Sequence, residues 1–445
     1  MPDPVTVTDI RRARERFDPD VVRETPVERS RSLSEMSGAD VRLKMEHLQR
    51  TGSFKTRGAS NKLHEVVAAG EGEPSEPPKR TECAGRGRSE ESSKERSDPG
   101  DGDASREHGD AERVVAASAG NHAQGVALAA SNAGIAATVV MPEDAPQAKV
   151  DATRGYDAEV VLRGREFQEA VAHARDLAAE PGSVFIHAYD DPAIVAGQGT
   201  LGLEIAEQVP DLDTVIVPIG GGGLVAGIAT ALAAVAPEVR VVGVQAKDAA
   251  TVPESLDKGE PVDREHTRTI ADGIATGGVA DLTYDLIERH VDEVVTVSDD
   301  EIAHAILTLL ERAKQLVEGA GAASVAGLLS GRIDVAGETV VPVLCGGNID
   351  MSMLDTVLEH AMTDRDQLPR LRVRIEDEPG ELSTLSTVLA DRGANVRHVR
   401  HDRAVEDLRV GEAYLVFEVA AAGREHAGQL IDAIRDRGYE VARVN

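Results

Sequence analysis

The sequence repeats one pattern: a short, continuously apolar segment followed by a stretch with helical spacing. Examples are VVAAS at 114–118, TVIVPIG at 214–220, VRVVGVQ at 239–245 and TVVPVLC at 339–345. An apolar run without alternation is typical of a strand buried on both faces, and helices between such strands make the strands parallel. The pattern predicts an α/β fold whose parallel sheets are covered on both faces and bind ligands beyond the carboxyl ends of the strands.

The composition excludes several classes of protein. The chain has 445 residues, 41% of them hydrophobic, which is enough for two or three domains with a sizeable core. The formal net charge of −30 argues against a nucleic-acid-binding protein. Such an excess of carboxylates, with lysine scarce beside arginine, is typical of proteins from salt-loving microbes.

The location of the protein is also constrained. No apolar run approaches the roughly 18 residues of a membrane span, and the first residues lack the apolar segment of a secretory signal. The two cysteines, Cys83 and Cys345, are too far apart in sequence to suggest a disulfide scaffold. We therefore expect a cytoplasmic protein with no membrane or nucleic-acid partner.

Two segments differ from the strand–helix pattern. Residues 71–112 are rich in Gly, Pro, Ser and charged residues and have no apolar period, which predicts a disordered surface insertion. Residues 369–445 read as strand, helix, strand, strand, helix, strand, the ferredoxin-like βαββαβ arrangement. We predict a main region over 1–365, with a smaller subdomain at roughly 56–155, and a linker plus second domain over 366–445.

The glycine run after TVIVPI is a candidate phosphate site. Gly220–Gly223 follow a strand and precede a helix, whose first N–H groups carry a partial positive charge. Without side chains the backbone can come close to an anion. The run is neither a Walker A motif nor a GxGxxG fingerprint. A tight turn is the simpler interpretation, but a turn needs fewer than four glycines.

Lys55 in TGSFKTRGA is a candidate nucleophile. It follows a strand end and begins a helix, close to the positive helix pole. The helix pole and partial burial both disfavour the charged ammonium and leave a neutral amine suited to a Schiff base. The alternative is an ordinary solvated lysine. Phe54 is one of only five phenylalanines, and core packing is its simplest role.

Two further strand-to-helix turns carry polar groups. In SAGNHAQG at 118–125, the amide of Asn121 and the N–H groups around it can bind a carboxylate, whereas His122 suits the start of a helix better than a catalytic base. In CGGNID at 345–350, Cys345 is either a small buried hydrophobe or a sulfur facing a ring nitrogen. The residues alone leave both interpretations open.

Taken together, SFKTRGA, SAGNHAQG, GGGGL and CGGNID resemble, in this order, the four motifs of the threonine/serine dehydratases. These are fold type II enzymes that use pyridoxal 5′-phosphate, and HAYDDPAIVAGQGTLGLEI is similar to their central segment. The resemblance covers roughly 5–365 apart from the insertion. It implies two parallel-sheet α/β domains, as in the β subunit of tryptophan synthase.

The resemblance also implies roles for individual residues. Lys55 would form the Schiff base with the cofactor, Phe54 would pack on its ring, and Cys345 would face the pyridine nitrogen. Asn121 would hydrogen-bond the ring hydroxyl. The phosphate would be bound by Gly220, Gly221, Gly222, Gly223 and Leu224. The substrate carboxylate would be bound by Ser118, Ala119, Gly120 and Asn121.

The implied reaction is deamination of L-threonine to 2-oxobutyrate and ammonia, with L-serine as a secondary substrate. Lys55 would remove the Cα proton as general base, and a neutral Cys345 would favour β-elimination over transamination. Serine racemases carry a second acid/base serine where this chain has Ala119, so racemisation ranks below deamination. A hydroxyaspartate ammonia-lyase, a β-replacement enzyme and a non-catalytic amino-acid sensor stay open as well. We expect no metal, because Gln245 and Thr251 occupy the positions of the family's cation ligands.

The tail resembles an ACT domain, a module that binds amino-acid effectors. DEPGEL at 377–382 matches the turn whose free N–H groups receive the effector carboxylate. Isoleucine is the natural expectation for a threonine deaminase, and such modules pair across subunits. We therefore expect a homo-oligomer, a dimer or tetramer. A dimerisation module without a ligand is the simpler interpretation of the tail.

Overall fold

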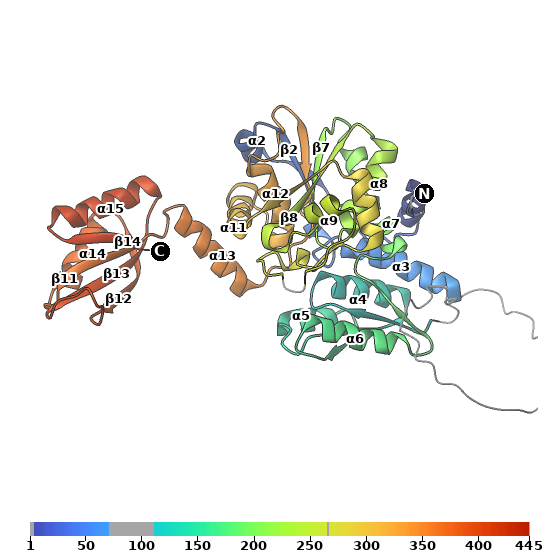
Figure 1. Cartoon of the computed structure of the whole chain (residues 1–445), viewed down its shortest axis with the longest axis horizontal. Coiled ribbons are helices and arrows are strands. Elements are labelled where there is room, and N and C mark those ends of the chain that lie inside the picture. Colours follow the sequence, from blue (N-terminus) through green and yellow to red (C-terminus); the bar gives the residue numbers. More distant parts are fainter. Residues whose placement is uncertain (1–3, 71–110, 265–266, 445) are drawn as a thin grey trace, which may run out of the picture.

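The computed structural model describes residues 4–70, 111–264 and 267–444. Cys83 and nearly all of the insertion expected at 71–112 lie outside the described residues. Three units are visible in Figure 1: a large α/β unit, a smaller one beside it and a third that extends away from both. Among the described residues, no helix has the length and apolar character needed to cross a bilayer.

The large unit is built on a six-stranded sheet of order β1-β2-β10-β7-β8-β9, parallel except for the β1–β2 pair. Its strands are β1 (Val27–Arg29), β2 (Asp40–Lys44), β7 (Thr214–Pro218), β8 (Arg240–Ala246), β9 (Glu293–Val297) and β10 (Thr339–Pro342). The edge strands β1 and β9 were not predicted from the apolar runs of the sequence. Both are only partly buried, so neither sequence is continuously apolar.

Helices cover both faces of this sheet, as expected for buried parallel strands. In Figure 1, α7 and α8 lie on one side of the strands and α11 and α12 on the other. The helices of this unit are α1 (Val7–Glu15), α2 (Arg31–Ser37), α7 (Pro192–Gln208), α8 (Gly223–Val235), α9 (Val252–Lys258), α10 (Asp281–His290), α11 (Asp299–Thr308) and α12 (Gly319–Leu329). A π-helical turn, η4 (Leu309–Ala313), follows α11, and short 3₁₀ turns form η1 (Glu46–Leu48), η2 (Lys247–Ala249) and η3 (Asp272–Ile274).

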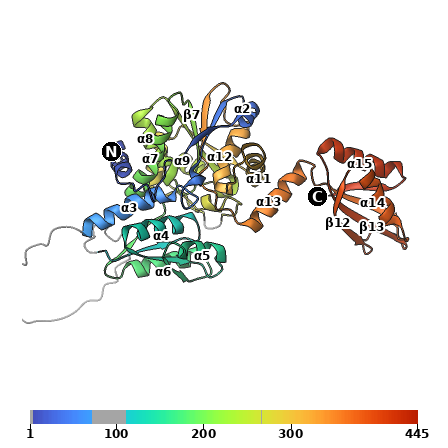
Figure 2. The ribbon, with the colours of Figure 1, turned by 180° about the vertical axis from the view of Figure 1, so that it is seen from behind.

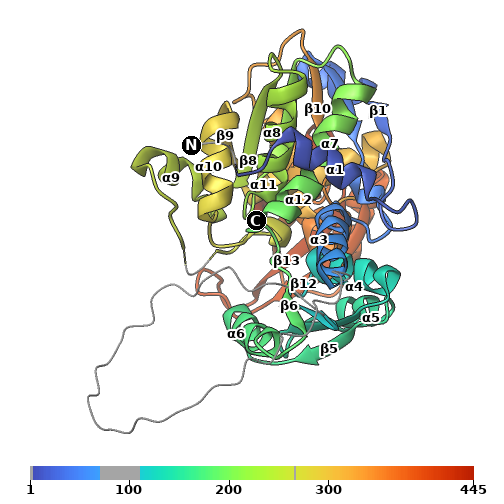
Figure 3. The ribbon, with the colours of Figure 1, turned by 90° about the vertical axis from the view of Figure 1, so that its right-hand side faces the viewer.

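The smaller unit has a four-stranded parallel sheet of order β5-β4-β3-β6. Its elements are β3 (Arg113–Ala117), β4 (Ala136–Met141), β5 (Glu159–Leu162), β6 (Ser183–Phe185), α3 (Lys55–Gly70), α4 (Asn121–Ala133), α5 (Gln147–Arg154) and α6 (Phe167–Ala178). Alternate residues of β3 lie on opposite faces of the sheet. Val114 and Ala116 pack towards α3 and α4, and Val115 and Ala117 pack towards α6. β5 and β6 lie beyond residue 155, the approximate limit predicted for this subdomain. Figure 3 shows this unit below the large one, with α3 and α4 on the side that faces it.

The third unit is an antiparallel sheet of order β12-β13-β11-β14 with two helices packed on it. Its elements are β11 (Arg370–Glu376), α14 (Glu381–Asp391), β12 (Asn395–Asp402), β13 (Glu412–Ala420), α15 (Arg424–Asp436) and β14 (Glu440–Val444). This order of elements confirms the predicted βαββαβ arrangement. Together with the two parallel sheets, it confirms the predicted fold class.

The third unit is carried on α13 (Met351–Asp364), as Figures 1 and 2 both show. The two residues that follow α13 make ion pairs with different units: Arg365 with the large unit and Asp366 with the third unit. Arg365 Nη1 donates to Glu311 Oε2 of the π-helical turn at 2.9 Å. Asp366 is buried and accepts from Arg424 Nε at 3.0 Å, and it also pairs with Arg443 of β14. The joint between the units is therefore defined by ion pairs rather than by a loose linker.

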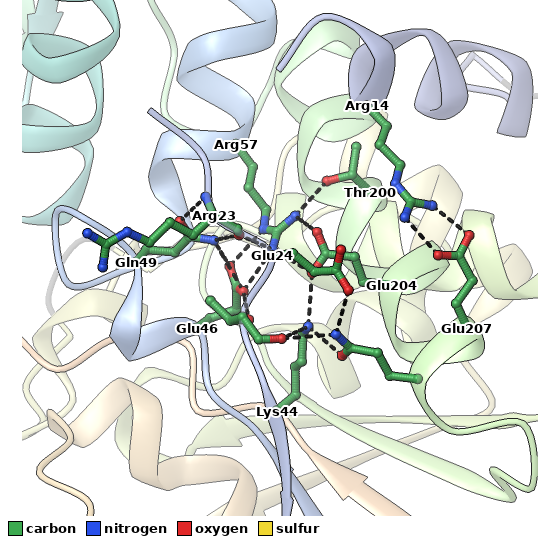
Figure 4. Close-up of polar contacts among 12 residues, drawn as sticks. Arg14, Arg23, Glu24, Lys44, Glu46, Gln49, Arg57, Thr200, Glu204 and Glu207 are labelled. Atoms are coloured by element: carbon green, nitrogen blue, oxygen red, sulfur yellow. Dashed lines mark hydrogen bonds and ion pairs between the residues drawn. The ribbon is translucent and has the colours of Figure 1, made fainter. Parts of the chain in front are cut away.

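A buried ion network fixes the start of α3 (Figure 4). The Arg57 guanidinium donates to Glu46 Oε2 at 2.7 Å and to Glu204 Oε1 at 2.6 Å. Glu46 lies in η1, directly after β2, whereas Glu204 lies on α7. Arg57 and Glu46 are fully buried, and Glu204 is 4% exposed. Arg57 therefore joins the first turn of α3 to two elements of the large unit.

Lys44 balances the charge of this network. Its Nζ donates to Glu204 Oε2 at 2.9 Å and to the Thr25 carbonyl oxygen at 2.7 Å. Two cations thus face two carboxylates. Burial opposes the charge on Arg57, but Glu46 and Glu204 outweigh it and raise the pKa of Arg57. At Lys44 the effect of burial is larger than that of Glu204 and Glu46, so the pKa of Lys44 is lowered.

We expect Arg57→Met to lower the free energy of unfolding by about 3–5 kcal/mol, because it leaves two buried carboxylates without their main partner. Chemical denaturation measures the loss. Arg31→Met is the matched control, since Arg31 pairs with Glu35 while 91% of its side chain is exposed. The control should leave the midpoint almost unchanged. Equal midpoints for the two variants would contradict a structural role of the network.

Candidate active site

Lys55 is the first residue of α3, and the preceding loop is paired with the loop after β10. Phe54 N donates to the Cys345 carbonyl oxygen at 3.2 Å, and Ser53 forms an antiparallel bridge with Gly346. The loop that carries Cys345 therefore runs beside the loop that carries Lys55. At Gly125 of α4, an added Cβ would lie 3.0 Å from the Lys55 carbonyl carbon, so α4 packs directly on this turn.

The Lys55 amine is held in a weakly solvated position. Its side chain is half-buried, and Nζ donates to the Ala188 carbonyl oxygen at 3.1 Å. The Phe54 ring centroid lies 5.2 Å from Nζ. Burial lowers the pKa of Lys55 to about 8, although Cys345 and Glu318 oppose the shift. A considerable fraction of the amine is therefore neutral near physiological pH.

The asparagine loop, Ser118–Asn121, lies at the carboxyl end of β3. Gly120 N donates to Ser118 Oγ at 3.1 Å, and nothing lies within 4 Å of a Cβ added at Gly120. Because α4 begins at Asn121, its first N–H groups have no acceptor within the helix. The loop therefore offers donors beside an open space.

His122 is not placed as a base. It is buried, and its Nε2 lies 3.0 Å from the Ile186 carbonyl oxygen, so Nε2 carries the proton and donates. Burial lowers the pKa of His122 to about 3. The residue is a neutral link between α4 and the segment after β6 and does not cap the start of the helix.

Asn121 is held at both ends of its amide. Its Nδ2 donates to Glu318 Oε1 at 2.6 Å, and its Oδ1 accepts from Asn348 Nδ2 at 2.8 Å. Glu318 immediately precedes α12, and burial raises its pKa to about 7. Asn348 belongs to the CGGNID segment, whereas no local motif marks Glu318.

The glycine turn is enclosed so closely that side chains would not fit. An added Cβ would lie 2.3 Å from the Tyr189 ring at Gly221, 2.9 Å from the Ile274 Cα at Gly220 and 2.9 Å from the Thr283 Cβ at Gly222. Gly222 has φ of +89°, a conformation that favours glycine. Gly223 and Leu224 open α8, so their N–H groups are free of helical acceptors. The turn is a backbone cradle at a helix N-terminus, as an anion site requires.

Cys345 is 2% exposed, and burial raises the pKa of its thiol, which therefore remains neutral. It lies close enough to Lys55 to affect the titration of the amine. Both interpretations offered for Cys345 remain compatible with this placement.

One segment links the lysine to the glycine turn. Ala188 accepts from Lys55, and the neighbouring Tyr189 ring lies over Gly221. The structure thus gathers Lys55, Phe54, Asn121, Cys345 and the glycine turn in one region. Three contributors were not among the predicted site residues: Tyr189, Glu318 and Asn348. The roles assigned by resemblance remain predictions.

Of the two side chains considered for a cation, that of Gln245 is engaged within the protein, whereas the buried Thr251 hydroxyl has no hydrogen-bond partner among the described residues. Gln245 Oε1 accepts from the backbone N–H of Thr251 at 3.1 Å and of Val252 at 2.9 Å. The amide oxygen is therefore used to hold the start of α9. The expectation that no metal binds here stays a prediction.

Comparison with known proteins agrees with this geometry. A model described as "Pyridoxal-phosphate dependent enzyme" matches residues 19–89 and 99–346, and an ACT domain model matches 370–438. L-threonine ammonia-lyase of Thermotoga maritima is 40% identical over 437 residues, which cover 98% of this chain and 99% of that protein.

Solved structures are similar as well. The processed form of threonine deaminase isoform 2 from Solanum lycopersicum has a TM-score of 0.67 at 34% identity, covering 80% of this chain and 87% of its own. Maize serine racemase has a TM-score of 0.66 at 31% identity, covering 81% and 99%.

The residues present fit pyridoxal phosphate. The four-glycine cradle excludes side chains and presents N–H groups, which suits a phosphate. Lys55 supplies an amine of lowered pKa, and Cys345 supplies a neutral thiol rather than a carboxylate. The donor set therefore matches an aldehyde cofactor that carries a phosphate.

We expect an amine-specific acylating reagent to label Lys55 of the cofactor-free protein with a rate that rises through pH about 8. The reagent attacks only the neutral amine, and a lowered pKa makes that form abundant at lower pH. Peptide mass spectrometry gives the rate at each site. Lys258, whose side chain is 52% exposed, serves as the control lysine on the surface. Identical profiles at the two lysines would contradict the assignment.

Proposed function

Because the chain belongs to the pyridoxal-phosphate dependent enzyme family and ends in an ACT domain, we propose that it deaminates L-threonine to 2-oxobutyrate and ammonia. The observation that carries the proposal is the similarity to an L-threonine ammonia-lyase along 98% of this chain, ACT domain included. The placement of Lys55 beside the glycine turn supports it.

Pyridoxal phosphate, when bound, provides the electron sink that stabilises negative charge at the substrate Cα. The chain supplies the proton transfers and the orientation. Lys55 would hold the cofactor, and its amine would take the Cα proton of the substrate. An amine of pKa about 8 is suited to this step, because a base works best when its pKa lies near the working pH.

The other residues orient the reactants. The N–H groups of Gly220–Leu224 would bind the phosphate, and those of Ser118–Asn121 would bind the substrate carboxylate. The neutral thiol of Cys345 gives no charge to the pyridine nitrogen, which favours loss of the β-hydroxyl over transamination. L-serine carries the same β-hydroxyl, so we propose its conversion to pyruvate as a secondary activity.

Racemisation is the second candidate, because a serine racemase shares the fold at 31% identity. Racemisation needs a proton donor on the face of the substrate opposite the lysine. The chain has Ala119 in the loop where racemases carry a serine, and His122, the residue that follows this loop, is bound to the Ile186 carbonyl oxygen. Deamination is therefore favoured over racemisation.

We also propose that the ACT domain binds an amino-acid effector, with isoleucine as the first candidate. In the turn between β11 and α14, the helix begins at Glu381 after Gly380, so the first N–H groups of the helix are available to a carboxylate. The opposed ion pairs of Arg365 and Asp366 give a route by which the domain contacts the catalytic region. Regulation requires unequal effector affinity for two states of the enzyme.

The purified holoenzyme should release 2-oxobutyrate and ammonia in equal amounts from L-threonine, and pyruvate more slowly from L-serine. Ammonia detection combined with identification of the oxo acid measures both. Lys55→Ala should lose the activity by at least a thousandfold, because it removes both the cofactor link and the base. Chiral analysis of residual serine tests for racemisation. Formation of D-serine without oxo acid would replace deamination by racemisation.

Isoleucine should change the threonine concentration needed for half-maximal rate, and the change should disappear in Asp366→Asn if the joint transmits it. The measurement is a threonine titration with and without isoleucine. D-isoleucine provides the control for non-specific effects. Indifference to isoleucine, valine and the other amino acids would leave the ACT domain as a module without an effector.

A further inference from the structure

Glu318 has no part in the proposed reaction, yet its carboxylate lies within the site. It precedes α12 as the N-cap residue, where a carboxylate ordinarily accepts from an N–H group of the first helical turn. Its side chain makes no such bond. Instead, Oε1 accepts from Asn121 Nδ2 at 2.6 Å. A helix-capping position is thus used to direct a carboxylate towards the asparagine loop.

Close backbone packing keeps Glu318 in this orientation. Its N–H donates to the Gly346 carbonyl oxygen at 3.1 Å. An added Cβ at Gly346 would lie 2.1 Å from Glu318 Oε1, and one at Gly321 would lie 2.4 Å from the Gly346 carbonyl oxygen. At Gly319, the added atom would lie 2.5 Å from the Ile270 carbonyl oxygen. The carboxylate can reach Asn121 because Gly346 has no side chain, and Gly319 and Gly321 allow the backbones around it to pack closely.

The contacts of Asn121 assign the direction of its amide. Oδ1 accepts from Asn348 Nδ2, which also donates to the Thr51 carbonyl oxygen at 2.6 Å. Nδ2 donates to Glu318, which as a carboxylate can only accept. One hydrogen of Nδ2 remains unused in these contacts. If the Asn121 amide were reversed, its oxygen would face the Glu318 carboxylate oxygen and its NH₂ group would face the Asn348 NH₂ group, so both hydrogen bonds would be lost.

We propose that Glu318 is a positioning residue whose ionised carboxylate fixes the Asn121 amide, so that the remaining N–H of Asn121 meets the ring hydroxyl oxygen of bound pyridoxal phosphate. The inference rests on the proposed function in that it takes Asn121 to contact this oxygen. Hydrogen bonds to an ionised acceptor are roughly twice as strong as neutral ones, so protonation of Glu318 loosens the amide.

The surroundings of Glu318 set the pH at which its carboxylate gains a proton, and this pH lies in the neutral range. Burial raises its pKa to about 7; the Asn121 hydrogen bond and Lys149 of α5 oppose the rise, and Asp272 of η3 adds to it. The backbone N–H of Asn348 also opposes the rise, and the charge of Glu318 interacts with Lys55 of α3 and with Cys345 after β10. A carboxyl with a raised pKa becomes protonated as pH falls through about 7, so the fixed form of Asn121 is the form present above that pH.

The test is to measure the visible absorption spectrum of the holoenzyme, which arises from the bound cofactor, at a series of pH values. The wild-type spectrum should change with a midpoint near pH 7, and Glu318→Gln should lack this transition. Turnover of threonine by Glu318→Gln should fall about ten- to a hundredfold, the loss expected for one charged hydrogen bond. Glu318→Gln combined with Asn121→Ala should lose no more than Asn121→Ala alone.

Two further variants separate positioning from a general structural effect. Asp272→Asn removes a negative charge that raises the pKa of Glu318, so the spectral midpoint should move to lower pH and remain present. Glu338→Gln is the matched control, since Glu338 is a half-buried carboxylate bonded to Thr214. It should leave the midpoint unchanged.

A transition near pH 7 that persists in Glu318→Gln overturns the proposal, and so do additive losses in the double variant. The result is separable from the proposed function. If threonine is not deaminated while the cofactor spectrum still loses its transition in Glu318→Gln, the reaction assignment fails and the positioning role stands.

Discussion

The position of Lys55 depends on charges that no substrate touches. Arg57 lies two residues further along α3 and is clamped by Glu46 of the large sheet and Glu204 of α7. Buried ion pairs add little net stability compared with apolar packing, but they are costly to break and demand one geometry. Because α7 packs on α8, the same clamp sets Lys55 in register with the glycine turn that opens α8. The ion network thus supplies geometry that a purely apolar core would leave less defined.

The site itself is assembled from strand ends. β3, β7 and β10 deliver the asparagine loop, the glycine turn and Cys345 to one region, as parallel strands do at their carboxyl ends. Two of these loops lead into helix N-termini, those of α4 and α8. Their N–H groups can bind a carboxylate and a phosphate without any added cation. Burial lowers the pKa of Lys55 in a site built for anions, although Cys345 and Glu318 oppose the shift.

The sequence was sufficient for the fold class, because continuous apolar runs and glycine-rich turns are local signals. It was also sufficient to single out Lys55, Asn121 and the glycine turn as candidates. Contacts between distant segments left no such signal. Glu318 bonds to Asn121 across 197 positions, and Arg57 to Glu204 across 147, so neither pair has a spacing that a motif could reveal. The edge strands β1 and β9 escaped detection because partial burial breaks the apolar run.

Two electrostatic regimes therefore coexist in one chain. The chain carries a net charge of −30, and salt screens the repulsion between exposed charges within about 10 Å at 0.1 M. In the site, burial shifts Lys55, Glu318 and Cys345 towards their neutral forms. The anion-binding groups there are backbone dipoles, which are fixed by the fold and screened far less than exposed charges. The two regimes meet at Asp272, an exposed carboxylate of η3 that helps to raise the pKa of the buried Glu318.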